Sequence, residues 1–386
     1  MGAAESITTG RLRCDGDAVL RNRPVRIMLV DDSVVARAII ENIIERDDNF
    51  EVIASVSSAT EALSALAHAA PEIVILDIEM PGMSGITALP MILDKSRGAR
   101  VLILSANCAA GGPAAVEALA HGADDTLIKP GRGTFAGSFA TTLIERLHAL
   151  STIDRAGDAR SDDHRPARLK AIGAFPKLPP ASNAADRRDG EVSAIGIGAS
   201  TGGIMAINAF LGALPRDLVC PIFITQHLPS NFMPFFAEQL HRLIGRTVFV
   251  GEDGMRVAPE CIYLAPGDGH LALSYVNGTT RIVIDRSAAA SGAMPSVDPM
   301  LASMADVYGE KACGVMLSGM GSDGLSGARR LRVSGGLILA QDIESSVVWG
   351  MPGAVAREGI AHAVQNPLAL AAIVASAGLR ASGVGR

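Results

Sequence analysis

The fold is decided first by residues 25–33, VRIMLVDDS, a strand-like run that ends in two carboxylates and a hydroxyl. Strands that are buried on both faces appear as continuous Val, Ile and Leu runs. Similar runs recur along the next hundred residues, separated by helical periodicity. The strands are expected at 26–30, 51–55, 73–76, 101–104 and 126–128, and the helices at 34–44, 59–69, 114–121 and 139–150. This alternation predicts a doubly wound α/β unit with a parallel sheet.

A second alternation begins at residue 194. Strands are expected at 194–197, 221–225, 261–264, 282–284, 313–317 and 337–340, and helices at 204–211, 300–308 and 327–333. Between the two halves the chain is rich in charge and proline and has little apolar periodicity, which is typical of a linker. The domains are therefore expected as a disordered leader (1–23), a first α/β domain (24–148), a linker (149–190) and a second α/β domain (191–384).

Composition narrows the class of protein. Hydrophobic residues make up 48% of the chain, charged residues 19%, and the net charge is -6. An acidic chain without a concentrated basic face argues against nucleic-acid binding. The apolar stretches are too short to span a bilayer and no signal core is present, which predicts a cytoplasmic protein without membrane insertion. The scattered cysteines also fit a reducing compartment: Cys14, Cys108, Cys220, Cys261 and Cys313.

Polar residues follow four predicted strands of the first half: Asp31 and Asp32, then Asp77, Ser105 and Lys129. The carboxyl ends of parallel strands share one edge of a sheet, so these side chains are expected to converge. Grouped carboxylates suit a hard cation such as Mg²⁺, and a hydroxyl and an ammonium can contact a phosphoryl group beside it. Taken singly, each residue could instead be a helix cap, a turn residue or a solvated charge.

Residues 25–148 resemble a response-regulator receiver, which has a flavodoxin-like fold. The motifs that carry the resemblance are DDS at 31–33, LDIEMPGMSG at 76–85, SA at 105–106 and KP at 129–130. It implies phosphorylation of Asp77 by a histidine kinase, with Ser105 and Lys129 as switch residues. It also implies Mg²⁺ bound by Asp31, Asp32, Asp77 and the backbone of Glu79. One departure is Thr126, because receivers usually carry an aromatic residue there.

In the second half, Ser200 lies in the segment GASTGG at 198–203, between a predicted strand and a predicted helix. Small neighbouring residues allow a tight turn on which a nucleophilic hydroxyl is accessible. The same segment also fits a phosphate loop at a helix N-terminus, because Gly196 and Gly198 suggest a dinucleotide fingerprint. The following strand separates these two interpretations.

That strand ends in Gln226 and His227, not in the acidic residue that a dinucleotide site needs to bind ribose. A histidine can accept the proton of Ser200 and return it to a leaving group. A lone histidine on such a loop is more often structural, but beside a candidate nucleophile catalysis is favoured. Asp323 follows a later strand and would orient the ring, although it could be only a helix cap. The backbone N–H of Met320 is the best oxyanion donor nearby.

Residues 190–382 resemble the CheB-type chemotaxis protein-glutamate methylesterases. The segments that carry the resemblance are IGASTGG at 197–203, QHLP at 226–229, YLAPGD at 263–268, PSVD at 295–298, LSGMGSDG at 317–324, AQD at 340–342 and SSVVWGMPG at 345–353. The resemblance implies a monomeric enzyme that hydrolyses glutamate methyl esters on methyl-accepting chemotaxis receptors and also deamidates receptor glutamines. Ser200, His227 and Asp323 would be catalytic and Met320 and Thr201 supporting, and the esterase reaction would need no cofactor. Met294 departs from the basic residue usual before PSVD.

Two other classes compete with this interpretation. One is a receiver-controlled binding module with an inactive esterase site. The other is a nucleotide-dependent oxidoreductase, which the Gln226-His227 strand end makes improbable. For an active esterase, the hypothesis is that the unphosphorylated receiver covers the crevice of Ser200 and that phosphorylation of Asp77 loosens this contact.

Overall fold

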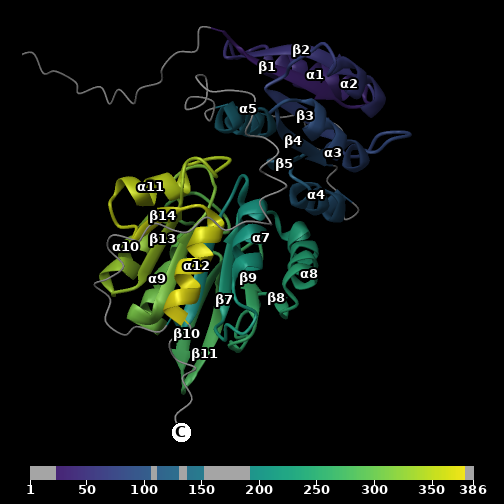
Figure 1. Cartoon of the computed structure of the whole chain (residues 1–386). Helices are drawn as coiled ribbons and strands as arrows, with labels where there is room; N and C mark the ends of the chain where they lie inside the picture. Colours follow the sequence, from purple (N-terminus) through teal and green to yellow (C-terminus); the bar gives the residue numbers. More distant parts are fainter. Residues whose placement is uncertain (1–22, 106–110, 130–136, 152–191, 379–386) are drawn as a thin grey trace, which may run out of the picture.

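In a computed structural model the chain forms two parallel sheets in separate α/β domains (Figure 1). The structure describes residues 23–105, 111–129, 137–151 and 192–378. Most of the predicted leader and linker, together with Cys14 and Cys108, lie outside the described residues. Within those residues, no helix has the length and apolar character needed to cross a membrane.

The first sheet has five parallel strands in the order β2-β1-β3-β4-β5. This is the strand order of flavodoxin-like doubly wound folds, which confirms the predicted fold class. Every residue of β3 is buried, as expected of a central strand with helices on both faces. The strands are β1 (Val25–Val30), β2 (Phe50–Val56), β3 (Ile73–Asp77), β4 (Arg100–Ser105) and β5 (Asp125–Ile128).

Five helices cover this sheet: α1 (Val34–Ile44), α2 (Ala59–Ala65), α3 (Gly85–Lys95), α4 (Gly111–Ala120) and α5 (Gly137–Ser151). The first three begin after a serine whose hydroxyl accepts a backbone N–H of the first turn. Helix α3 was not predicted. It contains Pro90, and proline is unfavourable in the interior of a helix. Gly85 lets α3 start close to β3, because a Cβ there would lie 2.1 Å from the carbonyl oxygen of Asp77.

The second sheet has seven parallel strands in the order β14-β13-β12-β6-β7-β9-β8. The chain runs outward from β6 to one edge and then restarts at β12 on the other side of β6. Ligand sites in such sheets form at this reversal, beyond the carboxyl ends of the strands. The strands are β6 (Ala194–Ala199), β7 (Ile222–Gln226), β8 (Val248–Val250), β9 (Ile262–Leu264), β12 (Ala312–Met316), β13 (Leu337–Gln341) and β14 (Ala363–Gln365).

An antiparallel hairpin, β10 (His270–Val276) and β11 (Thr279–Asp285), extends from this domain, and only part of β11 was predicted. Its turn is Asn277-Gly278, and both residues have positive φ, as a tight hairpin turn requires. The helices are α7 (Gly203–Ala213), α8 (Met233–Ile244), α9 (Val297–Tyr308), α10 (Leu325–Val333), α11 (Met351–Arg357) and α12 (Pro367–Gly378), with 3₁₀ turns η2 (Ser230–Phe232) and η3 (Gly309–Lys311). Of these, α8, α11 and α12 were not predicted.

The receiver-like domain lies on the carboxyl-end edge of the second sheet (Figure 1). Helix α4 packs against α7 and α8. Gly112 of α4 is so close to Phe235 of α8 that a Cβ would lie 2.9 Å from its ring. Phe139 and Leu143 of α5 share a buried cluster with Val347 and Val348 of the second domain. The first domain therefore rests on the edge where the second domain carries its predicted site.

Candidate active site

Ser200 lies in the tight turn between β6 and α7. Its N–H donates to the carbonyl of Ser318 at 2.9 Å, and its carbonyl accepts from Nε2 of Gln226 at 2.9 Å. Gly202 has a φ of 73°. A Cβ there would lie 2.3 Å from that of Val347, so the turn requires glycine. The backbone of Ser200 is thus fixed from both neighbouring strands.

The predicted base and carboxylate contact each other. His227 follows β7, and its Nε2 lies 2.9 Å from Oδ2 of Asp323, which lies between β12 and α10. Its backbone N–H donates to the carbonyl of Ala199 at 3.0 Å, beside the nucleophile turn. Nδ1 of His227 has no hydrogen-bond partner among the described residues. It is therefore the ring nitrogen left to accept a proton.

Three donors hold the carboxylate of Asp323. Besides His227, Oδ1 accepts from the hydroxyl of Ser296 at 2.5 Å and Oδ2 accepts from the N–H of Val297 at 2.7 Å. Burial by itself raises the pKa of Asp323, but these hydrogen bonds, that of His227 foremost, lower the pKa below its ordinary value. The ionised carboxylate can therefore orient the His227 ring and stabilise its protonated form.

The hydroxyl of Ser200 makes no hydrogen bond to any described residue, and Ser200 is 6% exposed. Gly319, in the loop after β12, lies directly against it, because a Cβ at Gly319 would be 2.9 Å from that of Ser200. Ser200, His227 and Asp323 thus occupy the ends of three adjacent strands. The structure joins His227 to Asp323 and leaves the hydroxyl of Ser200 unbonded beside them.

The predicted supporting residues flank this turn. The backbone N–H groups of Met320 and Thr201 have no acceptor within the described parts of the chain, so both are open to a developing oxyanion. The neighbouring N–H of Gly319 is bound to the carbonyl of Val348 at 3.0 Å. The Thr201 hydroxyl does not line the crevice. It donates to Oδ2 of Asp125, in the first domain, at 2.6 Å.

Asp125 is the centre of a polar contact between the two domains. Arg146 Nη1 lies 2.6 Å from Oδ2 of Asp125 and 2.8 Å from Oγ1 of Thr201. The N–H of Gly202 donates to the carbonyl of Asp124 at 2.8 Å. A small cavity of about 10 Å³ at this contact is lined by Asp124 and Asp125 of the first domain and by Ser200 and Gly202 of the second. The nucleophile turn is therefore in direct contact with the first domain.

Several site residues were missed by sequence reasoning: Gln226, Ser296, Ser318 and Gln341. Gln341 accepts the N–H of Ser318 at 2.8 Å, and Ser318 in turn donates its hydroxyl to the carbonyl of Thr201 at 2.7 Å. All four lie within segments that drew attention as motifs. A motif does not tell which of its polar side chains faces the neighbouring strand.

At the receiver edge, Asp31, Asp32 and Asp77 offer carboxylate oxygens that all lie within 4.8 Å of one another. Nζ of Lys129 lies 2.6 Å from Asp31 and 2.7 Å from Asp77. Burial raises the pKa of Asp77 to about 6, helped by the charge of Asp31 and opposed by Lys129. Three carboxylates beside a single ammonium leave an excess of negative charge, and their hard oxygen donors fit a divalent cation such as Mg²⁺.

The remaining receiver residues lie around this cluster. The N–H of Glu79 donates to Oδ1 of Asp77 at 3.3 Å, which places residue 79 beside the carboxylate. The hydroxyls of Ser105 and Thr126 are buried, and neither has a hydrogen-bond partner among the described residues. Ser105 ends β4 and Thr126 lies in the adjacent strand β5. Ser105 therefore ends the strand next to that of Asp77, whereas Thr126 lies further back, opposite Ile103.

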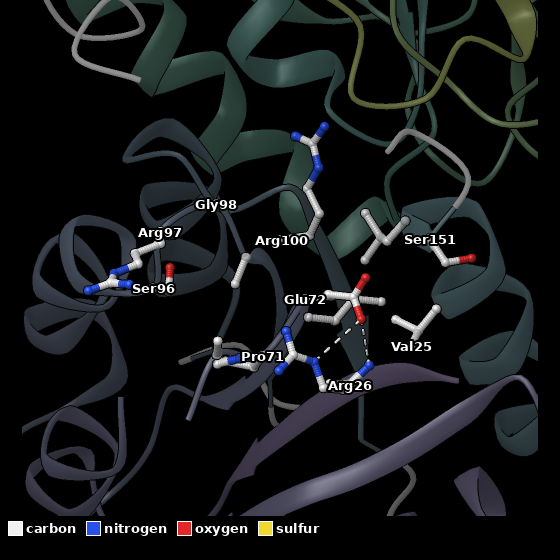
Figure 2. Close-up of a pocket in the computed structure, with 13 residues that line it drawn as sticks. Val25, Arg26, Pro71, Glu72, Ser96, Arg97, Gly98, Arg100 and Ser151 are labelled. Carbon is white, nitrogen blue, oxygen red and sulfur yellow. Dashed lines mark hydrogen bonds and ion pairs between the residues drawn. The ribbon is translucent and has the colours of Figure 1, made fainter. Parts of the chain in front are cut away.

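A larger cavity lies elsewhere, at the amino ends of the receiver strands (Figure 2). It measures about 180 Å³ and is lined by Arg26, Glu72 and Arg100 among others. Figure 2 shows Arg26 bound to Glu72, whose carboxylate accepts the Arg26 N–H at 3.0 Å. None of the predicted site residues lines this cavity, so its size does not identify the active site.

The fold and these groups define a class: a parallel-sheet α/β domain with a serine, a histidine and an aspartate at adjacent strand ends, joined to a receiver-like domain. Comparison with known proteins extends this: the response regulator receiver domain model matches residues 27–134, and the CheB methylesterase model matches residues 195–374. A solved CheB methylesterase catalytic domain from Thermotoga maritima is 35% identical, covers 49% of this chain and 99% of that chain, and has a TM-score of 0.47.

Two full-length relatives complete the comparison. The protein-glutamate methylesterase/protein-glutamine glutaminase of Maricaulis maris is 34% identical over 368 residues, which is 88% of this chain and 92% of that protein. The corresponding protein of Nitrobacter hamburgensis is 38% identical over 354 residues, 89% of this chain and 91% of that protein. The chain belongs to the CheB-type protein-glutamate methylesterase family, and the predicted resemblance is confirmed.

Proposed function

We propose that this protein is a phosphorylation-regulated protein-glutamate methylesterase. Its substrates are glutamate methyl esters on methyl-accepting chemotaxis receptors, and its products are glutamate and methanol. Deamidation of receptor glutamines, releasing ammonia, is its second activity. The observation that carries the proposal is the 2.9 Å contact of His227 with Asp323 beside Ser200. The names of full-length relatives support the same two activities.

In the first half of the reaction, the hydroxyl of Ser200 attacks the ester carbonyl while Nδ1 of His227 accepts its proton. Asp323 keeps the ring oriented and stabilises the imidazolium. The carbonyl oxygen becomes an oxyanion that the N–H groups of Met320 and Thr201 stabilise, each worth about 10²- to 10³-fold in rate.

In the second half, His227 returns its proton to the leaving oxygen, so methanol departs and an acyl-enzyme ester forms on Ser200. A water molecule then gives a proton to His227 and attacks the acyl carbon. As this second tetrahedral species collapses, His227 returns that proton to the oxygen of Ser200, which restores the hydroxyl and leaves a glutamate side chain on the receptor. With a glutamine substrate, the same proton reaches the amide nitrogen and ammonia leaves.

In the receiver, Asp77 is proposed as the phosphoacceptor for a chemotaxis histidine kinase. Mg²⁺, when bound, neutralises the charge of the phosphoryl oxygens, and it would be held by Asp31, Asp32, Asp77 and the carbonyl of Glu79. Lys129 and Ser105 contact the remaining phosphoryl oxygens. The close carboxylates and the unpartnered hydroxyl of Ser105 support these assignments.

The unphosphorylated receiver is proposed to inhibit the esterase by covering Ser200. Support comes from the contacts of Asp125 and Arg146 with Thr201, the residue after the nucleophile. Removal of residues 1–150 should therefore raise esterase activity. Unchanged or lower activity in the truncated protein would contradict inhibition.

The domain limits proposed are 24–148 for the receiver and 191–384 for the esterase, with a leader over 1–23 and a linker over 149–190. The family-model matches at 27–134 and 195–374 fall within these limits. A cytoplasmic, monomeric protein without a nucleic-acid partner is proposed from the acidic charge and the separated cysteines.

The proposal is tested by methanol release from methylated receptor membranes, with and without a small-molecule phosphoryl donor. The wild type should release methanol faster with the donor. Ser200→Ala should release none above background, and Asp77→Ala should lose the response to the donor. Equal release by wild type and Ser200→Ala, or none from either, would instead indicate a binding module with an inactive site.

A further inference from the structure

Ser296 is fully buried at the start of α9, with its hydroxyl between the helix and the triad. This hydroxyl donates to Oδ1 of Asp323 at 2.5 Å and accepts the N–H of Asp298 at 3.3 Å. The next N–H, that of Val297, donates to Oδ2 of Asp323 at 2.7 Å. The first turn of α9 thus places one donor on each carboxylate oxygen. This leaves one orientation of the carboxylate, in which Oδ2 also meets His227.

His270 fixes the backbone of Ser296 from the β10–β11 hairpin. Its Nδ1 lies 2.8 Å from the N–H of Ser296, and its Nε2 lies 2.9 Å from the carbonyl of Ser287. An N–H can only donate and a carbonyl can only accept, so the His270 ring carries its proton on Nε2. His270 is 1% exposed, so water does not compete for these bonds.

We infer that Ser296 is a positioning residue of the esterase triad and that His270 holds Ser296 in place. Four hydrogen bonds then link five residues in a continuous path, from Ser287 through His270, Ser296 and Asp323 to the ring of His227. Without the Ser296 hydroxyl, Oδ1 of Asp323 loses its hydrogen bond and the carboxylate is free to rotate away from Nε2. This inference rests on the proposed esterase function, because it assigns a role within that triad.

The electrostatics agree with the geometry. The hydrogen bond from Ser296 is one of the contacts that lower the pKa of Asp323 against the effect of burial. The N-terminus of α9 also presents the positive end of a helix dipole to this carboxylate. An ordinary helix cap would stabilise α9 alone, whereas this serine bonds to the helix and to the triad through the same oxygen.

The test separates positioning from capping in the full-length protein, activated with a phosphoryl donor. Ser296→Ala should lower kcat for methanol release at least tenfold while KM changes less than twofold, because substrate contacts are intact. Ser296→Thr keeps the hydroxyl and should recover most of kcat. The matched control is Ser58→Ala, which removes the equivalent cap of α2, 3.2 Å from the N–H of Glu61. It should leave kcat unchanged.

Two results would overturn the inference: a kcat for Ser296→Ala within twofold of wild type, or equal losses in Ser296→Ala and Ser296→Thr at equal thermal stability. If Ser296→Ala does not fold, Ser296→Gly serves in its place, because glycine is tolerated at helix N-caps, and it must show the same split between kcat and KM. Ser200→Ala in the same assay distinguishes failure of the proposed esterase function from failure of the proposed role of Ser296. If Ser200→Ala is inactive and Ser296→Ala is normal, the triad stands and the role of Ser296 is rejected.

Discussion

The receiver and the esterase domain both gather polar groups at the carboxyl ends of parallel strands, but a buried aspartate meets opposite surroundings in each. Burial and the charge of Asp31 raise the pKa of Asp77 to about 6, although Lys129 opposes them. Burial also acts on Asp323, yet its hydrogen bonds to His227, Ser296 and Val297 prevail and lower its pKa.

In both domains the strand order fixes where the polar side chains lie. The number of hydrogen-bond donors around the buried carboxylate then decides which chemistry that carboxylate can support. The receiver edge keeps several carboxylates and one ammonium, which suits a cation and a phosphoryl group. The esterase edge keeps one fully bonded carboxylate, which suits the orientation of an imidazole. Four predictions test this contrast, beginning with the largest effect.

His227→Gln should lower kcat for methanol release by about 10⁴-fold or more, because no group is left to accept the proton of Ser200. The measurement is steady-state hydrolysis with the receiver phosphorylated. The control is His241→Gln, a histidine at the surface of α8 whose ring nitrogen Nδ1 lies 2.8 Å from the carbonyl of Arg246. Activity within tenfold of wild type in His227→Gln would remove this residue from the mechanism.

Asp323→Asn should lower kcat by about 10³- to 10⁴-fold, because an amide no longer stabilises the protonated ring. Since the folded pKa of Asp323 lies below the ordinary value of 3.8, its ionised form and the stability it provides are lost only as the pH falls below about 4. The pH profile of kcat should therefore show no titration of this carboxylate between about pH 5 and 8. A large residual rate in Asp323→Asn would mean that the ionised carboxylate of Asp323 is not needed for catalysis, which would contradict the contrast drawn with Asp77.

The receiver should lose stability as the pH rises from about 4 to about 6. Asp77 binds a proton in the folded state up to a pKa of about 6, against 3.8 for an ordinary aspartate. Its ionisation therefore costs the folded receiver about 3 kcal/mol across that window. Hydrogen exchange of β3 amides in Mg²⁺-free buffer measures this cost.

Asp77→Asn should remove this pH dependence, whereas Asp94→Asn, at an exposed position of α3, should keep it. Added Mg²⁺ should restore stability to the wild type at pH 7. A flat profile in the wild type would mean that Lys129 already neutralises the cluster.

The smallest effect is expected where the two domains meet. Asp125→Asn weakens the charge-assisted bonds to Arg146 and Thr201, so the unphosphorylated enzyme should become about tenfold more active. Asp48→Asn, an exposed aspartate on the same domain, should change nothing. Basal activity is measured without a phosphoryl donor, and an unaltered rate in Asp125→Asn would show that this contact does not hold the receiver closed.

Much of the fold could be predicted because buried parallel strands have continuous apolar sequences, as in β3 and β12. The strand-end residues Asp77 and His227 followed from these assignments. Helix α3 was missed because Pro90 interrupts its pattern, although its serine cap was visible in the sequence. Only part of β11 in the hairpin was predicted, although the Asn277-Gly278 sequence is typical of a hairpin turn.

The site was predicted less completely than the fold. Ser200 and Asp323 lie in distinctive glycine-rich segments, but Gln226 and Ser296, which hold them, do not. His270 contacts the triad only through Ser296, and it belongs to a hairpin outside the main sheet. Its role depends on tertiary packing between α9 and the hairpin, which local periodicity does not encode.

Strand β5 is the outermost strand of the receiver sheet, paired only with β4 among the described strands. Lys129 follows one end of it and contacts Asp77, while Asp125 at the other end contacts Thr201. About 13 Å of extended chain therefore separates Lys129, at the phosphorylation site, from Asp125, at the nucleophile turn. An edge strand can shift with fewer broken hydrogen bonds than an inner one, so the strand that contacts both sites is also one of the least costly to displace.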